Sequence, residues 1–121
     1  LYAHGNAAAE AWNTVLPGAI VFQDSGILIV LTPDAEMWTP CIVDGKPMSC
    51  LPNGKFAGAL VHIRTGLPEE CKSRTLAHEM GHLLGLPHLV GSSLMADRGP
   101  SRAERCVGWI VDDVAAAYLL Q

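Results

Sequence analysis

Apolar and polar positions divide the beginning of the chain into one helical stretch and two short extended ones. The alanine-rich segment Asn6 to Leu16 contains Trp12 and ends before Pro17-Gly18, a pair that breaks helices, so we predict a helix there. The β-prone runs Ala19 to Gln23 and Ile27 to Leu31 are separated by Asp-Ser-Gly, which predicts a strand, a turn and a second strand. Because Ile27 to Leu31 is apolar throughout, we expect this strand at the centre of a sheet.

Further along, the pattern predicts a long loop, another strand and a last helix. Thr32 to Gly54 is rich in proline and shows no periodicity, which is typical of a loop. Ala57 to Arg64 is typical of a strand, and the amphipathic stretch Trp109 to Leu120 is expected to pack as a C-terminal helix. No repeat or linker divides the chain, so residues 1–121 are predicted to form a single domain.

Composition favours a soluble globular protein. The chain has 121 residues, of which 50% are hydrophobic and 17% charged, and its formal net charge is −4. It is not basic enough to favour nucleic acid as a partner. The longest strongly apolar run, Ile27 to Leu31, is far shorter than the ~20 residues of a membrane helix, and no charged-then-apolar leader opens the chain. We therefore expect an already processed monomer that binds neither nucleic acid nor membranes.

The cysteine count predicts two disulfides. An even number of cysteines in a small domain, without C-x-x-C spacing, favours disulfides over a zinc finger; the residues are Cys41, Cys50, Cys71 and Cys106. Three pairings are possible. We favour Cys41 with Cys50, which closes the long loop, and Cys71 with Cys106, which ties two helix approaches together. This interpretation predicts an oxidising compartment and a secreted, extracellular protein. Four reduced, buried thiols are the alternative.

One segment has the spacing of a zinc site. From His78 to His88 the sequence is His-Glu-Met-Gly-His-Leu-Leu-Gly-Leu-Pro-His, which matches H-E-x-x-H-x-x-G-x-x-H at every fixed position. Leu76 to Leu84 has helical spacing, and residues four apart on a helix lie about 40° apart around the axis, so His78 and His82 point the same way. Gly85 lets the chain leave the helix sharply and return His88 as a third nitrogen, with the fourth tetrahedral position open.

The same segment contains a candidate general base. Glu79 is offset by about 100° from His78, too far round to be a ligand but near enough to reach a zinc-bound water. A zinc ion held by three neutral histidines lowers the pKa of its bound water towards about 7. We predict one catalytic Zn²⁺ on His78, His82 and His88, with Glu79 as the catalytic base. The alternative is that the histidines only occupy a polar helix face.

These residues resemble the extended motif of the metzincin clan of zinc endopeptidases. Met95, in the run Ser-Ser-Leu-Met-Ala, is similar to the methionine of the clan's Met-turn, which lies beneath the three histidines; a generic core residue is the alternative. Both ends of the chain also resemble, more weakly, the corresponding parts of small, matrixin-like or minimal metzincin domains. The resemblance implies an α+β, metzincin-like zincin fold: a mixed twisted sheet with an active-site helix, the Met-turn and a C-terminal helix.

The resemblance also implies a substrate and a reaction. Ala57 to Arg64 would be an antiparallel edge strand above the cleft, where a peptide or protein substrate adds as a further strand; the substrate-binding residues would be Gly58, Ala59, Leu60 and Val61. The expected function is that of a zinc metalloendopeptidase, which hydrolyses peptide bonds with a zinc-bound water activated by Glu79. A catalytically weak zinc-binding peptide-recognition module is the alternative, and hydrolysis of a non-peptide amide is a third reading.

Overall fold

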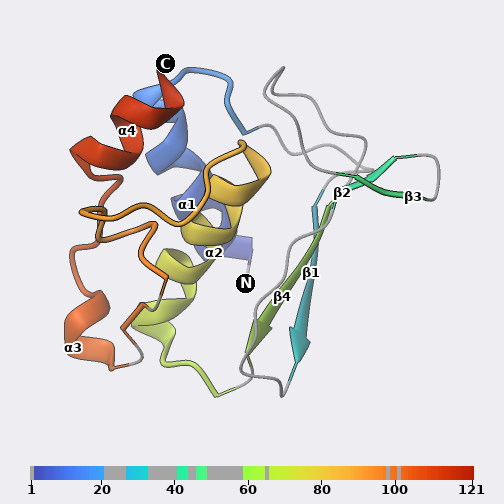
Figure 1. Cartoon of the computed structure of the whole chain (residues 1–121). Helices are drawn as coiled ribbons and strands as arrows, with labels where there is room; N and C mark the ends of the chain where they lie inside the picture. The colour runs from blue at the N-terminus through green and yellow to red at the C-terminus, as the bar shows by residue number, and fades with distance from the viewer. Residues whose placement is uncertain are drawn as a thin grey trace.

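The computed structural model describes residues 2–20, 27–32, 41–43, 46–48, 59–64, 66–97, 99–100 and 102–121, and it places side chains in 3–20, 66–97, 99–100 and 102–121. Figure 1 shows its elements. The helices are α1 (Tyr2–Val15), α2 (Glu69–Leu83), α3 (Ala103–Cys106) and α4 (Asp113–Leu119). The strands are β1 (Ile27–Thr32), β2 (Cys41–Val43), β3 (Lys46–Met48) and β4 (Ala59–Arg64). Among the described residues, no helix has the length and apolar character needed to cross a membrane.

Helix α2, which carries the metal-site motif, begins earlier than the periodicity predicted. It starts after Pro68, and Glu69 and Glu70 place negative charge at the end where backbone N–H groups lack helical partners. Its end is confirmed at Gly85, which has a φ of 95°. There the N–H of Gly85 donates to the His82 carbonyl at 3.0 Å and the N–H of Leu86 to the Gly81 carbonyl at 2.9 Å. This glycine-dependent pair of hydrogen bonds turns the chain towards His88.

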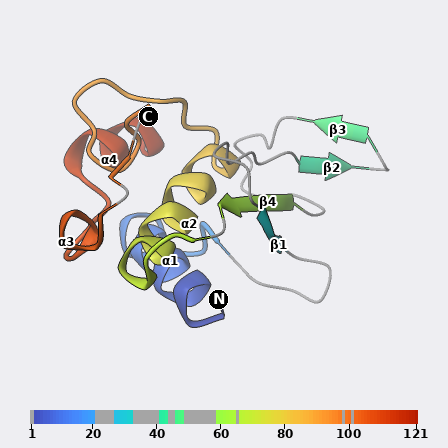
Figure 2. The same cartoon turned by 90° about the horizontal axis from the view of Figure 1, so that it is seen from below.

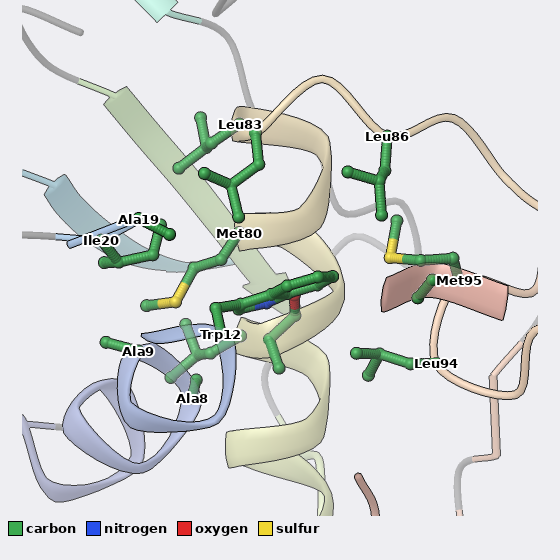
Figure 3. Packing of buried hydrophobic residues seen from close by; sticks show 14 of the residues in the cluster. Ala8, Ala9, Trp12, Ala19, Ile20, Met80, Leu83, Leu86, Leu94 and Met95 are labelled. Atoms are coloured by element: carbon green, nitrogen blue, oxygen red, sulfur yellow. The ribbon is translucent and has the colours of Figure 1, made fainter. Parts of the chain in front are cut away.

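The core of the described side chains is formed where α1 packs on α2 (Figure 3). Trp12 of α1 is fully buried, and its indole Nε1 donates to the Ala77 carbonyl of α2 at 2.7 Å. Met80 and Leu83 project from α2 on the side of α1, while Leu94 and Met95 lie on another side of α2. α2 is therefore enclosed by apolar side chains both from the chain's beginning and from the segment after His88.

Ala19 and Ile20, predicted to begin a strand, instead follow α1 as irregular backbone. The side chain of Asn13 accounts for this, because its amide accepts from the Ile20 N–H at 2.8 Å and donates to the Ile20 carbonyl at 2.9 Å. Both backbone groups that a sheet would use are thus already paired. The remainder of the predicted strand, 21–23, lies outside the described residues.

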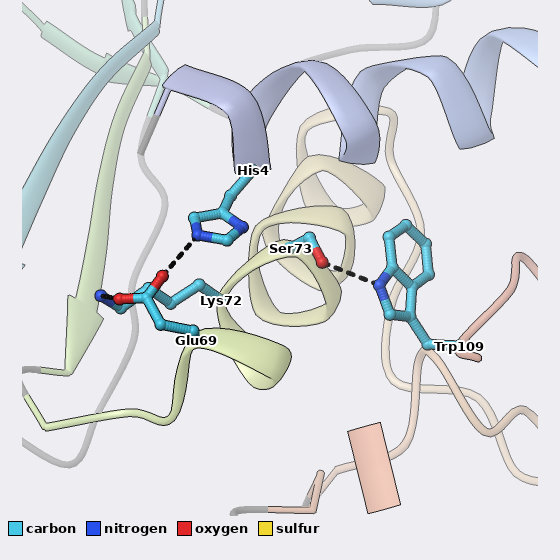
Figure 4. A network of polar contacts seen from close by, with 5 residues as sticks. All are labelled: His4, Glu69, Lys72, Ser73 and Trp109. Atoms are coloured by element: carbon cyan, nitrogen blue, oxygen red, sulfur yellow. Dashed lines mark hydrogen bonds and ion pairs between the residues drawn. The ribbon is translucent and has the colours of Figure 1, made fainter. Parts of the chain in front are cut away.

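Side-chain contacts also attach α1 and the segment before α4 to α2 (Figure 4). His4 Nε2 of α1 lies 2.7 Å from Glu69 Oε2, and Lys72 Nζ donates to the other oxygen of the same carboxylate at 2.6 Å. On the other side of α2, the indole Nε1 of Trp109 donates to Ser73 Oγ at 2.9 Å. Trp109 thus docks the segment before α4, which begins later than predicted, at Asp113.

The strands form one sheet in the order β1-β4-β2-β3 (Figure 2). β1 and β4 are parallel, from Ile27 opposite Ala59 to Thr32 opposite Arg64, whereas β2 is antiparallel to both β3 and β4. β4 lies beside α2. In Figures 1 and 2, the sheet and α4 lie on opposite sides of α2, the metal-site helix.

The sheet order contradicts the expected edge strand. β4 lies between β1 and β2, with Ala59 opposite Cys41, and its long partner β1 is parallel to it. Sequence alternation is the same whichever neighbours a strand has, so the order could not be inferred from it. Of the predicted substrate-binding residues, Gly58 lies outside the described residues, as do the side chains of Ala59, Leu60 and Val61. Their role in binding substrate stays a prediction.

The predicted fold class is wrong for the part of the molecule that carries the site. Of the residues whose side chains are placed, 54% are helical and none lies in a strand, which conflicts with a site framework built on a mixed sheet. The physical reason is that, among the side chains that the structure places, the buried ones come from α1, α2, α3, α4 and the connections next to them. The described core is a helical assembly, and the expected metzincin-like sheet framework is corrected accordingly.

One of the two favoured disulfides is confirmed. Cys71 in α2 is bonded to Cys106 in α3, with an S–S distance of 2.04 Å. Both cysteines are fully buried, so the bond lies inside the helical core. The pairing of Cys41 with Cys50 lies outside the described residues, because Cys50 and the side chain of Cys41 belong to the part that the structure leaves undescribed.

Candidate metal centre

Three histidines converge as the sequence predicted. His78 and His82 lie one turn apart on α2, and His88 is returned to them by the turn at Gly85. Their ligand nitrogens all lie within 4.8 Å of one another, and His78 Nε2 is 3.2 Å from His82 Nε2. The ring centroids are 4.7, 4.9 and 5.3 Å apart. The cluster can hold a metal ion.

Backbone carbonyls fix the tautomers of the two helical histidines. His78 Nδ1 lies 2.6 Å from the Leu94 carbonyl, and His82 Nδ1 lies 2.7 Å from the Leu86 carbonyl. A carbonyl oxygen can only accept, so each Nδ1 must be the protonated, donating nitrogen. In the neutral ring the lone pair is therefore on Nε2. This arrangement orients the rings as metal-binding histidines are normally oriented.

His88 is held differently, by a carboxylate. Its Nδ1 lies 3.0 Å from Asp97 Oδ1, and the side chains of His88 and Asp97 are 43% and 83% exposed. The carboxylate accepts from Nδ1, so Nε2 is again the nitrogen left for a ligand bond. The site thus combines two histidines supported by backbone with one histidine supported by an exposed side chain.

The donor set fits a zinc ion. With Nδ1 of each neutral ring donating to a carbonyl, the Nε2 atoms of His78 and His82 lie 3.2 Å apart, where one cation can accept both lone pairs. Tetrahedral zinc with Zn–N bonds of about 2.0–2.1 Å requires N···N separations of about 3.3 Å, so these two nitrogens already have the required spacing. The exposed His88 can close the remaining gap, and imidazole is a ligand that suits zinc.

Burial keeps His78 neutral. Removal from solvent lowers the pKa of His78 to about 4; the hydrogen bond to Leu94 opposes this, and the charges of His82, His88 and Arg74 add to it. A histidine with this pKa is unprotonated at neutral pH, so its Nε2 is available as a lone-pair donor.

Glu79 is buried beside the ligands. It follows His78 on α2 and is only 2% exposed. A carboxylate placed there by the helix is restrained by the surrounding core and does not extend into solvent. Its proposed role as a base stays a prediction.

Met95 packs closely against the turn of α2 that joins His78 to His82. Met95 is fully buried, and a Cβ added at Gly81 would lie 2.5 Å from its Sδ and 2.9 Å from its Cε. Sequence reasoning located Met95 but did not identify Gly81 as the residue that makes room for it. The structure therefore places Met95 next to the helix backbone of the site.

The segment Ser92–Met95, which we call the support turn, is held by Asp112. Asp112 Oδ2 accepts from Ser92 Oγ at 2.8 Å and from the Leu94 N–H at 2.9 Å. Ser92 Oγ in turn accepts from the Met95 N–H at 2.9 Å. Since Leu94 also supplies the carbonyl for His78, the N-cap residue of the C-terminal helix is connected to the metal centre through this turn.

Sequence reasoning missed the groups that support the histidine rings. The Leu86 and Leu94 carbonyls belong to the backbone, which has no signature in the sequence. Asp97 stands in a charged segment, next to Arg98, and nothing in the sequence links its carboxylate to His88. Comparison with protein-family models, with curated proteins and with solved structures gave no match. The chemistry of the site is accordingly inferred from its own residues.

Proposed function

We propose that the chain is a zinc-dependent endopeptidase of the metzincin type. The observation that carries the proposal is the convergence of His78, His82 and His88, each with Nδ1 on an oxygen and Nε2 available for a ligand bond. Among the described residues, no further His, Cys, Asp or Glu belongs to this cluster. Three protein ligands with an open fourth position are typical of catalytic zinc, whereas structural zinc normally has four.

The chemistry assigned to the site divides between the ion and Glu79. When bound, a zinc ion supplies Lewis acidity towards a carbonyl oxygen and lowers the pKa of a coordinated water. Glu79 accepts the proton of the attacking water and then donates it to the leaving amine. The buried position of Glu79, one residue from His78, supports this assignment. The substrate of such a site is an extended peptide or an unfolded protein.

The Cys71–Cys106 disulfide supports a location outside the reducing cytosol. Disulfides persist in oxidising compartments and are rare in the reducing cytosol. We propose that the peptidase acts as a secreted protein.

The decisive test compares zinc content with proteolysis of unfolded casein. We expect the wild-type protein to bind one zinc ion and cleave casein, and a chelator to abolish cleavage. Glu79→Gln should retain zinc but lose about 10²–10⁴-fold in rate, because a positioned base contributes this much. His82→Ala should lose both zinc and activity. Glu10→Gln, which neutralises an exposed carboxylate on α1, is the matched control and should match the wild type.

Two outcomes would contradict the proposal in different ways. Full activity in zinc-loaded Glu79→Gln would remove Glu79 from the reaction. Stoichiometric zinc with no cleavage of any peptide by the wild type, together with saturable peptide binding, would instead identify a zinc-containing recognition module.

A further inference from the structure

We propose that Arg74 is a positioning residue for the metal centre, which acts by orienting the backbone carbonyl that holds His78. The inference rests on the proposed zinc site but not on its catalytic activity. Arg74 lies one helical turn before His78 on α2, so the two side chains leave the helix on the same side.

Arg74 is buried, which is unusual for an arginine. It is 4% exposed, although a guanidinium is rarely buried without partners. The backbone at Gly99 lies directly against it, because a Cβ added there would collide with the guanidinium. The protein thus keeps this cation in a defined place, with a glycine opposite its charged end.

The guanidinium and Asp112 hold opposite ends of one peptide group. Arg74 Nη2 donates to the Ser93 carbonyl at 2.6 Å, and the Leu94 N–H donates to Asp112 Oδ2 at 2.9 Å. The Ser93 carbonyl and the Leu94 N–H belong to the same peptide unit. A cation at its oxygen and an anion at its N–H are aligned with the peptide dipole, and both hydrogen bonds are of the stronger, charge-assisted kind.

The adjoining peptide group is also held at both ends, and one of its partners is the metal ligand. The Leu94 carbonyl accepts from His78 Nδ1 at 2.6 Å, and the Met95 N–H donates to Ser92 Oγ at 2.9 Å. Only the backbone dihedrals of Leu94 separate this group from the one that Arg74 holds. The direction of the Leu94 carbonyl, and with it the orientation of the His78 ring, therefore depends on Arg74.

The test measures metal binding in Arg74→Met, which keeps an unbranched side chain but removes the charge and the donors. We expect zinc affinity, measured by competition with a chromophoric chelator, to fall about tenfold, the lower end for residues that support metal ligands indirectly. The visible absorption of the cobalt-substituted protein should change, since it reports ligand geometry. Arg74→Lys keeps the cation and a donor and should recover part of the affinity. Arg105→Met removes an exposed cation and should leave both readouts unchanged.

Unchanged zinc affinity and cobalt absorption in folded Arg74→Met would overturn the proposal and leave Arg74 with a purely structural role. If Arg74→Met does not fold, Gly99→Ala decides instead, because the added Cβ displaces the guanidinium without removing it. That variant should also weaken zinc binding, and wild-type behaviour would overturn the proposal. Both readouts require only metal binding, so a protein that binds zinc without cutting peptides would defeat the peptidase assignment while leaving this test intact.

Discussion

At the scale of single residues, Gly81 matters because other side chains pack closely against it, and not because it forms a turn. It lies inside α2, where alanine would normally be preferred by about 0.5–1 kcal/mol. A Cβ at this position would meet Met95 Sδ at 2.5 Å and Trp12 Cζ2 at 2.9 Å. Trp12 cannot retreat easily, because its indole is buried and hydrogen-bonded to Ala77. Steric conflict therefore outweighs helix propensity at this residue.

We expect Gly81→Ala to lower the free energy of unfolding by about 1–2 kcal/mol, since overpacking a core costs about 1–3 kcal/mol and the helix gain offsets part of it. Urea denaturation of the metal-free protein measures the change. In a Met95→Ala background the same substitution should cost less, because its closest neighbour is gone. A stabilised Gly81→Ala protein would show that the contact is relieved without cost.

At the scale of elements, α4 is connected to the metal centre through its N-cap. Asp112 Oδ1 accepts from the Ala115 N–H at 3.0 Å, while Oδ2 holds the support turn. Burial raises the pKa of Asp112, but the hydrogen bonds from Leu94, Ala115 and Ser92 together outweigh this and lower the pKa below its ordinary 3.8. One carboxylate thus caps α4 and also restrains the support turn next to His78.

The lowered pKa of Asp112 predicts acid-sensitive stability. A carboxylate whose pKa is lower in the folded than in the unfolded state stabilises the fold fully above the unfolded value of 3.8, and this contribution disappears as pH falls through the folded value. Asp112→Asn should therefore unfold at lower urea concentration than wild type at neutral pH, and the difference should shrink as the pH falls below 3.8. Asp113→Asn, its exposed neighbour, is the control. A difference that does not vary with pH would refute the assignment.

At the scale of the whole molecule, the disulfide joins α2 to α3 across 35 positions of sequence. The connection between its two cysteines includes all three histidines and the support turn. The bond therefore limits how far this region can expand when the chain unfolds.

Replacing both cysteines in Cys71→Ala/Cys106→Ala should cost about 3–4 kcal/mol of unfolding free energy, from the entropy of closing a loop of this length. Urea denaturation of oxidised protein provides the measurement, and Val107→Ala, an exposed change next to Cys106, should have no effect. Unchanged stability in the double variant would mean that the unfolded chain gains no freedom when the bond is removed.

The sequence predicted the histidine cluster because its determinants are local: helical spacing places His78 and His82 together, and Gly85 supplies the turn. It did not predict Arg74 as part of the support, because a charged residue on a helix is usually solvated and nothing local shows that Gly99 and Ser93 enclose it. The prediction that β4 lies at an edge of the sheet was wrong for a related reason. Strand neighbours such as Ile27 and Ala59 are distant in sequence, and alternation does not specify partners.

The backbone carbonyls and the side-chain carboxylate that hold the histidine rings differ in how easily a mutation can remove them. No codon change deletes a main-chain oxygen, so the partners of the two helical imidazoles persist through substitutions that preserve the local path of the chain. The third imidazole instead depends on a solvent-facing carboxylate at Asp97, which one nucleotide change can remove. Natural variants that change the metal affinity without disturbing the core are therefore expected to accumulate at Asp97, the support of the third histidine.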